Sequence, residues 1–185
     1  MLNSFNFLKA AVKNQKSLGA VAQSSRFLIN KIMESIDLRN AKVIVELGAG
    51  VGNITKIIAR NANSDARIFC FEINRDFCRQ IRRNVPDKRV VIINASAEEM
   101  KEYLKKFDIE KADVLISTLP FFNFSLEKKE KILSGISELI ENKGVFVLSQ
   151  YTNKLNTVLC HYFNNIKKKR IILNIPPAIV YVCRN

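Results

Sequence analysis

Cysteine and histidine are scarce in this sequence, and their spacing excludes the common metal and disulfide motifs. No two of the four cysteines form a C-x-x-C pair; they are Cys70, Cys78, Cys160 and Cys183. Cys70 and Cys183 fall within predicted strands, where a free buried thiol is ordinary. The single histidine, His161, lies in an apolar helical pattern that indicates a structural role. We therefore expect a reduced, cytosolic and metal-free protein.

Long hydrophobic runs are also missing. None approaches the ~20 residues of a transmembrane helix, and the N-terminus has no continuous apolar segment typical of a cleavable signal. The sequence contains no repeat and no low-complexity linker. With 185 residues, of which 48% are hydrophobic, the chain can build a full core. We expect one domain over 1–185, with helices over 1–36 and the main core over 42–185.

Acidic residues are absent from both ends of the chain, before Glu34 and after Glu141. These two segments carry 12 basic residues, against a net charge of +13 for the whole chain. Charge concentrated in this way predicts an anionic partner, either a membrane or a nucleic acid. An ordinary solvated surface is the alternative.

The most informative stretch that is present runs from Val43 to Ile58, VIVELGAGVGNITKII. It predicts a strand that reaches Glu46, then a tight loop, then a helix. Gly48, Gly50 and Gly52 follow G-x-G-x-G, whereas a dinucleotide site favours G-x-G-x-x-G. Glycines let a ligand approach the backbone closely, and Glu46 suits an ammonium or sulfonium better than a phosphate. The combination resembles motif I of class I S-adenosylmethionine-dependent methyltransferases, and we assign Glu46 and the three glycines to the cofactor site.

A second carboxylate follows the next predicted strand, over 66–71. Glu72 lies 20 residues after Gly52, where an acid accepts hydrogen bonds from both ribose hydroxyls. We assign Glu72 and its neighbour Ile73 to the cofactor site. A solvated acid that merely ends a strand is the alternative for Glu72. NAD stays open as a cofactor, because a ribose-binding acid suits it equally well.

A third strand is predicted over 89–93 and leads into Asn94-Ala95-Ser96. Methyltransferases of this class often place an acid there to bind the adenine amino group. This chain has Ser96 instead, so we expect backbone groups to recognise adenine. Ala95 and Ser96 are assigned to the cofactor site on this basis.

The remaining apolar runs complete the predicted sheet. They predict strands over 113–117, 144–150, 168–173 and 178–183, and a helix over 126–140. The last two strands are predicted to form an antiparallel hairpin. We expect a Rossmann-like α/β fold with a mostly parallel seven-stranded sheet, an antiparallel last strand, helices on both faces and additional N-terminal helices.

The first 16 residues have the periodicity of an amphipathic helix, with one apolar row and one basic row. Such a helix binds reversibly in a membrane interface; packing against the sheet edge is the alternative. The residues assigned to membrane binding are Leu2, Phe5, Leu8, Lys9, Val12, Lys13 and Lys16.

A second helix is predicted from Ser24 or Ser25 to Ile36. Ser25 and Arg26 are expected to line the substrate cleft, with Arg26 as a binder of carboxylate or phosphate.

The stretch from Lys111 to Ser125, KADVLISTLPFFNFS, predicts a strand that runs into a loop of proline and aromatic residues. Amino-methylating enzymes hold the acceptor nitrogen at such a loop; adenine and glutamine methylases use Asn/Asp-Pro-Pro-Tyr. The polar first residue is missing here, and the phenylalanines predict an apolar pocket for acyl chains, a flipped base or an ammonium. We assign roles in the reaction to Ser117, Leu119, Pro120 and Tyr151, with Ser117 also at the cofactor. Substrate contacts are assigned to Phe121, Phe122 and Asn123, although core packing is the alternative for Phe121.

Five segments occur in order along nearly the whole chain: GAVAQSSRFL, the glycine loop, FEINRDF, STLPFFNFS and NIPPAIVYVCR. Together they resemble the bacterial PmtA-type phospholipid N-methyltransferases. The resemblance implies S-adenosylmethionine as cofactor and stepwise methylation of phosphatidylethanolamine toward phosphatidylcholine. It also implies a cytoplasmic enzyme that docks on the inner face of the cytoplasmic membrane by its N-terminal helix. Similar enzymes act on ornithine-containing lipids.

Two other functions stay open. A ribosomal RNA adenine dimethylase shares much of this layout and also needs a basic surface. Against it, the acceptor loop has no Asn-x-Pro-Tyr and no additional RNA-binding domain is expected. A membrane adaptor that binds S-adenosylmethionine without transferring methyl groups is the other alternative.

Overall fold

The structure is a computed structural model that describes residues 26–174 and 176–185. The predicted helix over 2–16, the seven residues assigned to membrane binding and Ser25 lie outside this range. Their roles stay predictions.

The described chain alternates strands and helices. The strands are β1 (Val43–Leu47), β2 (Arg67–Phe71), β3 (Val90–Ile93), β4 (Ala112–Ser117), β5 (Ile140–Gln150), β6 (Asn165–Ile171) and β7 (Ala178–Arg184). The α-helices are α3 (Arg26–Met33), α4 (Asn53–Asn61), α5 (Arg75–Asn84), α6 (Met100–Lys105), α7 (Leu126–Leu139) and α8 (Asn156–Leu159). Two 3₁₀ turns, η1 (Ala97–Glu99) and η2 (Phe121–Asn123), follow β3 and β4.

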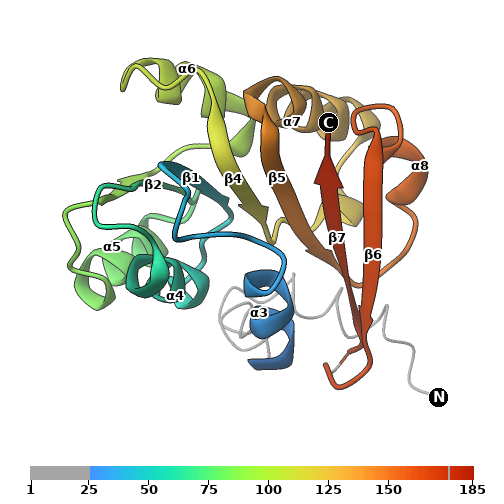
Figure 1. Cartoon of the computed structure of the whole chain (residues 1–185), viewed down its shortest axis with the longest axis horizontal. Coiled ribbons are helices and arrows are strands. Elements are labelled where there is room, and N and C mark those ends of the chain that lie inside the picture. The colour runs from blue at the N-terminus through green and yellow to red at the C-terminus, as the bar shows by residue number, and fades with distance from the viewer. Residues whose placement is uncertain (1–25, 175) are drawn as a thin grey trace.

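All strands join one seven-stranded sheet in the order β3-β2-β1-β4-β5-β7-β6 (Figure 1). The pairs from β3 to β5 are parallel, whereas β7 runs antiparallel to both β5 and β6. The predicted fold, with an antiparallel last strand, is confirmed. Since β6 is antiparallel to β7, it is parallel to β5, and both end at the same edge of the sheet.

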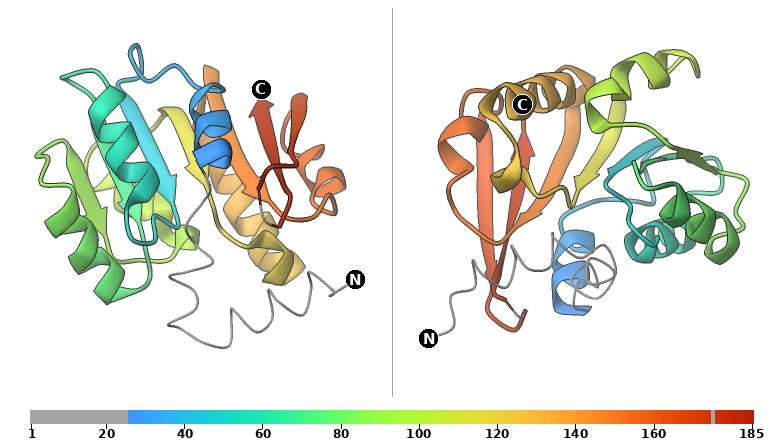
Figure 2. Two further views of the ribbon diagram at one scale, coloured as in Figure 1. Left: turned by 90° about the horizontal axis from the view of Figure 1, so that it is seen from below. Right: turned by 180° about the vertical axis from the view of Figure 1, so that it is seen from behind.

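Helices cover both faces of the sheet (Figure 2). Side chains of α3, α4 and α5 pack in one core cluster, and those of α6, α7 and α8 pack in the other. The inner parallel strands are buried on both faces and therefore consist almost entirely of apolar residues. Glu46 is the exception in β1.

Several predicted boundaries are wrong by a few residues. The first described helix ends at Met33 instead of Ile36, where the Ser35 hydroxyl donates to the Lys31 carbonyl (2.8 Å). Strand β6 begins three residues earlier than predicted, because Asn165 pairs with Arg184 of β7. It also ends earlier, since the residues after Ile171 form a turn.

The structure also tests the predictions for the scarce residues. Cys70, Cys78 and Cys183 are buried free thiols, and Cys160 is exposed. His161 is exposed, and α8 spans only four residues and ends before it. The helical pattern from which a structural role was predicted therefore does not extend to this residue. Within 26–174 and 176–185, no helix combines the length and apolarity that crossing a bilayer requires.

Candidate functional site

The glycine loop joins β1 to α4 at the carboxyl edge of the sheet. Gly48, Gly50 and Gly52 have φ values of 79°, 57° and 87°, in the left-handed region that side chains disfavour. The amides of Gly48 and Ala49 donate to the Phe71 carbonyl (2.8 and 3.2 Å), which ties the loop to the end of β2.

Each glycine meets a different environment. A Cβ on Gly48 would lie 2.9 Å from Leu119 Cδ2 in the loop after β4, and one on Gly52 would lie 3.2 Å from Ile81 of α5. A Cβ on Gly50 would meet no atom within 4 Å. Gly48 and Gly52 therefore permit close packing of neighbouring elements, whereas the Gly50 backbone faces open space.

Glu46 is buried beneath this loop, with 1% of its surface exposed. Its carboxylate accepts a hydrogen bond from the Thr55 hydroxyl of α4 (2.6 Å) and lies 3.6 Å from Cys70 Sγ. Burial raises the pKa of Glu46 to about 7. Glu46, Gly48, Gly50 and Thr118 are among the residues that line a small hollow of about 30 Å³.

Glu72 lies at the end of β2, beside the same loop. One carboxylate oxygen accepts from the Gly50 amide (2.8 Å) and the other from the Asn74 amide (2.8 Å). Each oxygen keeps a lone pair for a further donor. Burial raises the pKa of Glu72 as well. Its neighbour Ile73 is 73% exposed, which leaves an apolar side chain open beside the carboxylate.

Ser96 begins the η1 turn and forms a capping box with Glu99. Its amide donates to the Glu99 carboxylate (3.0 Å), and its hydroxyl contacts Glu98 (3.0 Å). Ala95 is buried. The amide and the hydroxyl of Ser96 thus already form hydrogen bonds with Glu99 and Glu98. To contact adenine as predicted, either group would have to form a second hydrogen bond.

The loop after β4 is fastened to the glycine loop. The Thr118 hydroxyl donates to the Gly48 carbonyl (2.8 Å), and the Leu119 amide donates to Ser117 Oγ (3.2 Å). Ser117 is buried and Pro120 is exposed. The structure thus brings the predicted acceptor loop and the predicted cofactor loop into direct contact.

The aromatic residues of this loop divide between core and surface. Phe121 is fully buried and packs against Phe124, with ring centroids 5.6 Å apart. Phe122 is half-buried and Asn123 is exposed. Phe121 therefore supports the loop instead of contacting a substrate, whereas the substrate contacts assigned to Phe122 and Asn123 stay predictions.

Tyr151 and Arg26 reach the same edge from other elements. Tyr151 follows β5 and is half-buried against the core cluster that includes α3, and burial raises its pKa. Arg26 is the first residue of α3 and is exposed. Their predicted roles stay predictions.

Two polar residues were missed by the sequence analysis. Gln150, buried at the end of β5, donates to the Leu119 carbonyl (2.8 Å) and so engages the backbone of a residue assigned to the reaction. Asn94 donates to the carbonyls of Glu72 and Ile73 (2.8 and 2.9 Å) and holds the ends of β2 and β3 together. In both cases the available signal is a polar residue at the end of an apolar strand.

The residues at this edge fit S-adenosylmethionine. The left-handed glycines leave the Gly50 backbone open to a ligand, and the Glu72 carboxylate offers free lone pairs beside it. Glu46 lines the same pocket and can interact with a cation. We find no group of three metal-ligating side chains in the described part of the chain.

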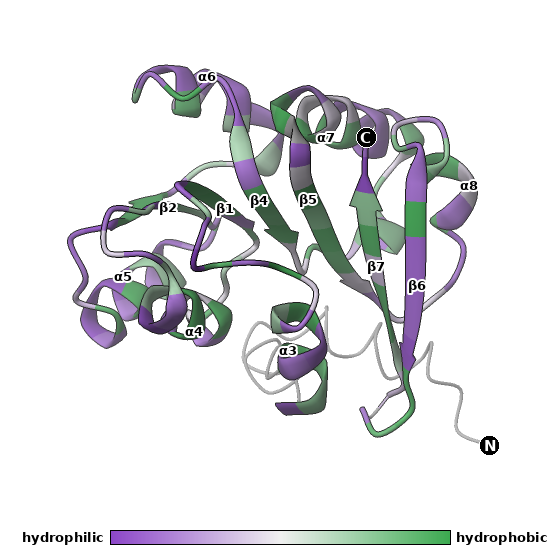
Figure 3. Ribbon diagram, viewed as in Figure 1, coloured by the Kyte–Doolittle hydropathy of each residue, from purple (hydrophilic) through white to green (hydrophobic). Residues whose placement is uncertain are grey.

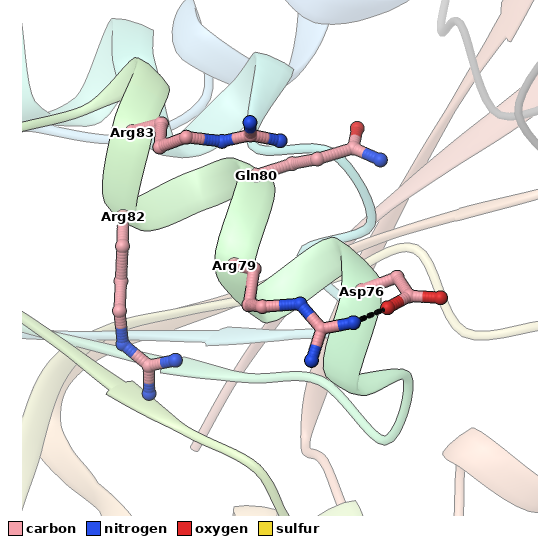
Figure 4. A pocket seen from close by; sticks show the side chains of 5 residues that line it. All are labelled: Asp76, Arg79, Gln80, Arg82 and Arg83. Carbon is pink, nitrogen blue, oxygen red and sulfur yellow. Dashed lines mark hydrogen bonds and ion pairs between the residues drawn. The ribbon is translucent and has the colours of Figure 1, made fainter.

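A helical patch of basic residues lies outside this site. Asp76, Arg79, Gln80, Arg82 and Arg83 of α5 line a surface hollow (Figure 4). Arg79 is ion-paired with Asp76, whereas the side chains of Arg82 and Arg83 extend away from that pair.

Comparison with known sequences and structures places the chain in a family. Its residues 11–171 match the family described as ribosomal RNA adenine dimethylase. An ornithine lipid N-methyltransferase from Singulisphaera acidiphila is 28% identical and covers 100% of this chain and 97% of its own length. Ribosomal RNA small subunit methyltransferase A from Mycoplasma mycoides is 30% identical over 75% of this chain, which spans 50% of that relative.

Solved structures share the fold at low identity. The N-methyltransferase NodS from Bradyrhizobium japonicum has a TM-score of 0.73 at 8% identity, covering 85% of this chain and 93% of its own. A putative rRNA-methylase from Clostridium thermocellum has a TM-score of 0.68 at 16% identity, covering 87% and 98%. The chain is thus a class I S-adenosylmethionine-dependent methyltransferase and belongs to the ribosomal RNA adenine dimethylase family.

Proposed function

We propose that this methyltransferase transfers a methyl group to the primary amine of a membrane lipid headgroup, with phosphatidylethanolamine as the expected substrate. The observation that carries the proposal is the contact between Leu119 and Gly48, which sets a Ser-Thr-Leu-Pro-Phe loop directly beside the cofactor loop. This loop has hydroxyls where adenine and glutamine methylases have an amide or carboxylate. The end-to-end similarity to an ornithine lipid N-methyltransferase supports the same reading.

The chemistry requires a neutral amine. An aminoethyl headgroup has a pKa near ~10, so it is an ammonium at neutral pH and must lose its proton before it can attack. When bound, S-adenosylmethionine supplies an electrophilic methyl group on its sulfonium. Positioning provides most of the acceleration in such a transfer.

The residues of the chain then have distinct tasks. Gln150 holds the Leu119 carbonyl, and Ser117 accepts from the Leu119 amide, so the loop backbone is fixed before the lipid arrives. Because burial raises the pKa of Tyr151, its hydroxyl stays protonated at neutral pH. Tyr151 can therefore orient the amine by hydrogen bonding, and we propose that water carries the proton away.

A ribosomal RNA adenine is the second candidate substrate. The arginines of α5 form a basic helical patch away from the cofactor pocket, of the kind that contacts phosphates. The family and several relatives named as ribosomal RNA methyltransferases favour this candidate. A non-catalytic membrane adaptor is the third alternative, in which the cofactor binds and no acceptor is methylated.

The test is methyl transfer from radiolabelled S-adenosylmethionine to vesicles, followed by chromatography of the extracted lipids. Vesicles of phosphatidylethanolamine and of ornithine lipid are assayed separately, with and without phosphatidylglycerol. We expect label in a methylated aminolipid, in larger amount when the anionic lipid is present. Label in neither lipid, with cofactor binding intact, would contradict the proposal.

A further inference from the structure

The turn between β6 and β7 exposes two large aliphatic side chains. The Asn174 amide donates to the Ile171 carbonyl (3.4 Å), so Ile172 and Leu173 occupy the two central positions of a β-turn. Glycine, proline, asparagine, aspartate and serine dominate such positions. Ile172 is 78% exposed and Leu173 is 68% exposed. This turn therefore has an apolar tip that its local conformation does not require.

The tip is held in place by the residues that follow it. Asn174 is buried, and its side chain donates to the Pro176 carbonyl (2.5 Å). Ile171 on the other side is buried in the core cluster that includes α3. The two aliphatic side chains thus project from an anchored base.

Strand β6, which leads into the tip, is strongly basic. Four consecutive residues, Lys167 to Arg170, carry positive charge, and no acidic residue occurs after Glu141. Side chains alternate along a strand, so Lys167 and Lys169 lie on one face and Lys168 and Arg170 on the other. Figure 3 shows this hydrophilic strand running into the hydrophobic turn.

The tip lies at the same edge of the sheet as the methyl-transfer site. Because β6 is parallel to β5 and β4, its end at Ile171 points in the same direction as the end of β4 at Ser117. Figure 1 shows the β6–β7 turn at the lower edge of the molecule, beside α3. A flat surface that receives the tip would therefore face the acceptor loop.

We propose that the Ile172–Leu173 turn inserts into an anionic lipid bilayer and, with the basic end of β6, forms a membrane-docking surface. This inference deepens the proposed function and rests on it for the choice of a lipid partner. Strand residues rise by about 3.3 Å each, so Lys169 and Arg170 lie about 7 to 10 Å behind Ile172. The headgroup layer on each side of a bilayer is about 5 to 8 Å thick. When the two aliphatic side chains reach the hydrocarbon boundary, the long side chains of these two basic residues can reach the lipid phosphates.

The chemistry of the tip favours lipid over nucleic acid. Proteins that bind single strands stack bases on aromatic or arginine side chains, and neither type is present at the two exposed turn positions. Branched aliphatic side chains gain by transfer into hydrocarbon, and clustered lysines are attracted to anionic leaflets.

The experiment uses the absence of tryptophan from the chain. Leu173→Trp in the full-length protein places a single fluorescent reporter at the tip, and Lys88→Trp places a matched reporter at an exposed position in the turn before β3. Vesicles of phosphatidylcholine with phosphatidylglycerol should shift the L173W emission to shorter wavelength and allow quenching by brominated acyl chains. The K88W emission should not change.

A second pair of variants measures affinity by co-sedimentation with the same vesicles. Ile172→Ser combined with Leu173→Ser should weaken binding by about 100-fold, and Lys169→Glu combined with Arg170→Glu by about 20-fold. The control Lys88→Glu should bind like the unmodified chain. Unchanged cofactor affinity shows that each variant is folded.

The outcomes separate this inference from the proposed function. An unshifted L173W spectrum, whether or not the protein co-sediments, would overturn docking by the turn, even if lipid is methylated. A shift caused by a ribosomal RNA fragment and not by vesicles would assign the turn to nucleic acid and overturn it as well. A shift with vesicles supports docking even if another acceptor receives the methyl group.

Discussion

Two carboxyl groups are buried within the cofactor edge, although burying a charge is costly unless it is paired. Glu46 has the Thr55 hydroxyl as its hydrogen-bond donor, and Glu72 has two backbone amides. No arginine or lysine is paired with either carboxylate in the described part of the chain. Both groups are thus arranged to receive a ligand that donates hydrogen bonds or carries positive charge.

Glu46 should make the unliganded protein less stable as pH rises. Its pKa in the folded state is about 7, above the usual 4.5, so the folded protein holds the proton more tightly than the unfolded chain. Its stabilising contribution is complete below pH 4.5 and is lost as pH rises to 7. The loss amounts to about 3 kcal/mol.

Glu46→Gln keeps an acceptor for Thr55 and removes the titration. We expect the free energy of unfolding of E46Q to vary less between pH 5 and pH 8 than that of the unmodified protein. Denaturant titrations resolve differences of ~1 kcal/mol, so they can measure this change. The exposed Glu102→Gln serves as control and should follow the unmodified protein. An E46Q profile with the original slope would contradict the assignment.

Gly50 and Gly48 should respond differently to alanine. Gly50→Ala places a Cβ in open space, so it costs only about 1 kcal/mol of backbone strain. The same methyl group would block the face that we propose the cofactor approaches. Gly48→Ala forces Leu119 away and should destabilise the protein more. Calorimetric titration with S-adenosylmethionine should show strongly weakened binding to G50A, and thermal unfolding should place G48A below G50A. Tight binding by G50A would show that the ligand lies elsewhere.

At the scale of elements, the site depends on how four strand ends are fastened to one another. The glycine loop is tied to β2 through the Phe71 carbonyl and to the loop after β4 through Thr118. Gln150 connects the loop after β4 to the end of β5. The acceptor loop thus owes its position to neighbouring strands, because its own residues form only the short η2 turn.

Gln150→Leu should therefore reduce the rate of methyl transfer indirectly, through the position of the acceptor loop, and leave cofactor binding unchanged. The substitution removes one of the two donors of the Leu119 carbonyl, which keeps the Phe121 amide (2.9 Å). We expect it to cost about 1 kcal/mol and to loosen the link between the loop and β5. We expect a lower kcat with an unchanged affinity for S-adenosylmethionine. The exposed Asn153→Ala, three residues away, is the control. Equal activity of Q150L and N153A would show that the loop holds its position by other contacts.

The strands and the glycine loop could be predicted from the sequence because their signals are local. Apolar runs that end in a carboxylate, and glycines at fixed spacing, do not depend on the rest of the chain. The local pattern Ser96-Ala97-Glu98-Glu99 also predicts the observed capping box, a signal the sequence analysis overlooked.

The remaining contacts depend on tertiary structure. Gln150 and Leu119 are separated by 31 positions, so nothing local to either residue reveals the bond. Phe121 is buried and Phe122 is partly exposed because of the way η2 packs on the core. The two residues are identical, so the sequence alone does not indicate which of them is buried. The exposed Ile172 and Leu173 were predicted as part of a strand, because aliphatic residues are typical of strands.

At the scale of the whole molecule, the features that we assign to ligand binding share one edge of the sheet. The glycine loop, the acceptor loop, the start of α3 and the β6–β7 turn all lie there (Figure 2). Most of the excess positive charge comes from the two ends of the chain. We infer that an anionic surface approaches this edge.

The lysines near the N-terminus provide a separate test of the anionic partner. Lys9→Glu, Lys13→Glu and Lys16→Glu in one variant should weaken binding to anionic vesicles, by about 1 kcal/mol for each lysine lost. Binding to vesicles of phosphatidylcholine alone should change little, as should methyl transfer to a soluble amine analogue. Equal affinity of the variant and the unmodified protein for anionic vesicles would show that these three lysines do not contribute to membrane binding.

The most direct test of the central claim is a competition between the two candidate acceptors in one reaction. The full-length protein, radiolabelled S-adenosylmethionine, anionic vesicles containing phosphatidylethanolamine and unmethylated small-subunit ribosomal RNA are incubated together, and the label is counted in the lipid and RNA fractions. We expect label to accumulate in the lipid fraction. Label confined to the RNA would contradict it and make this chain an adenine methyltransferase.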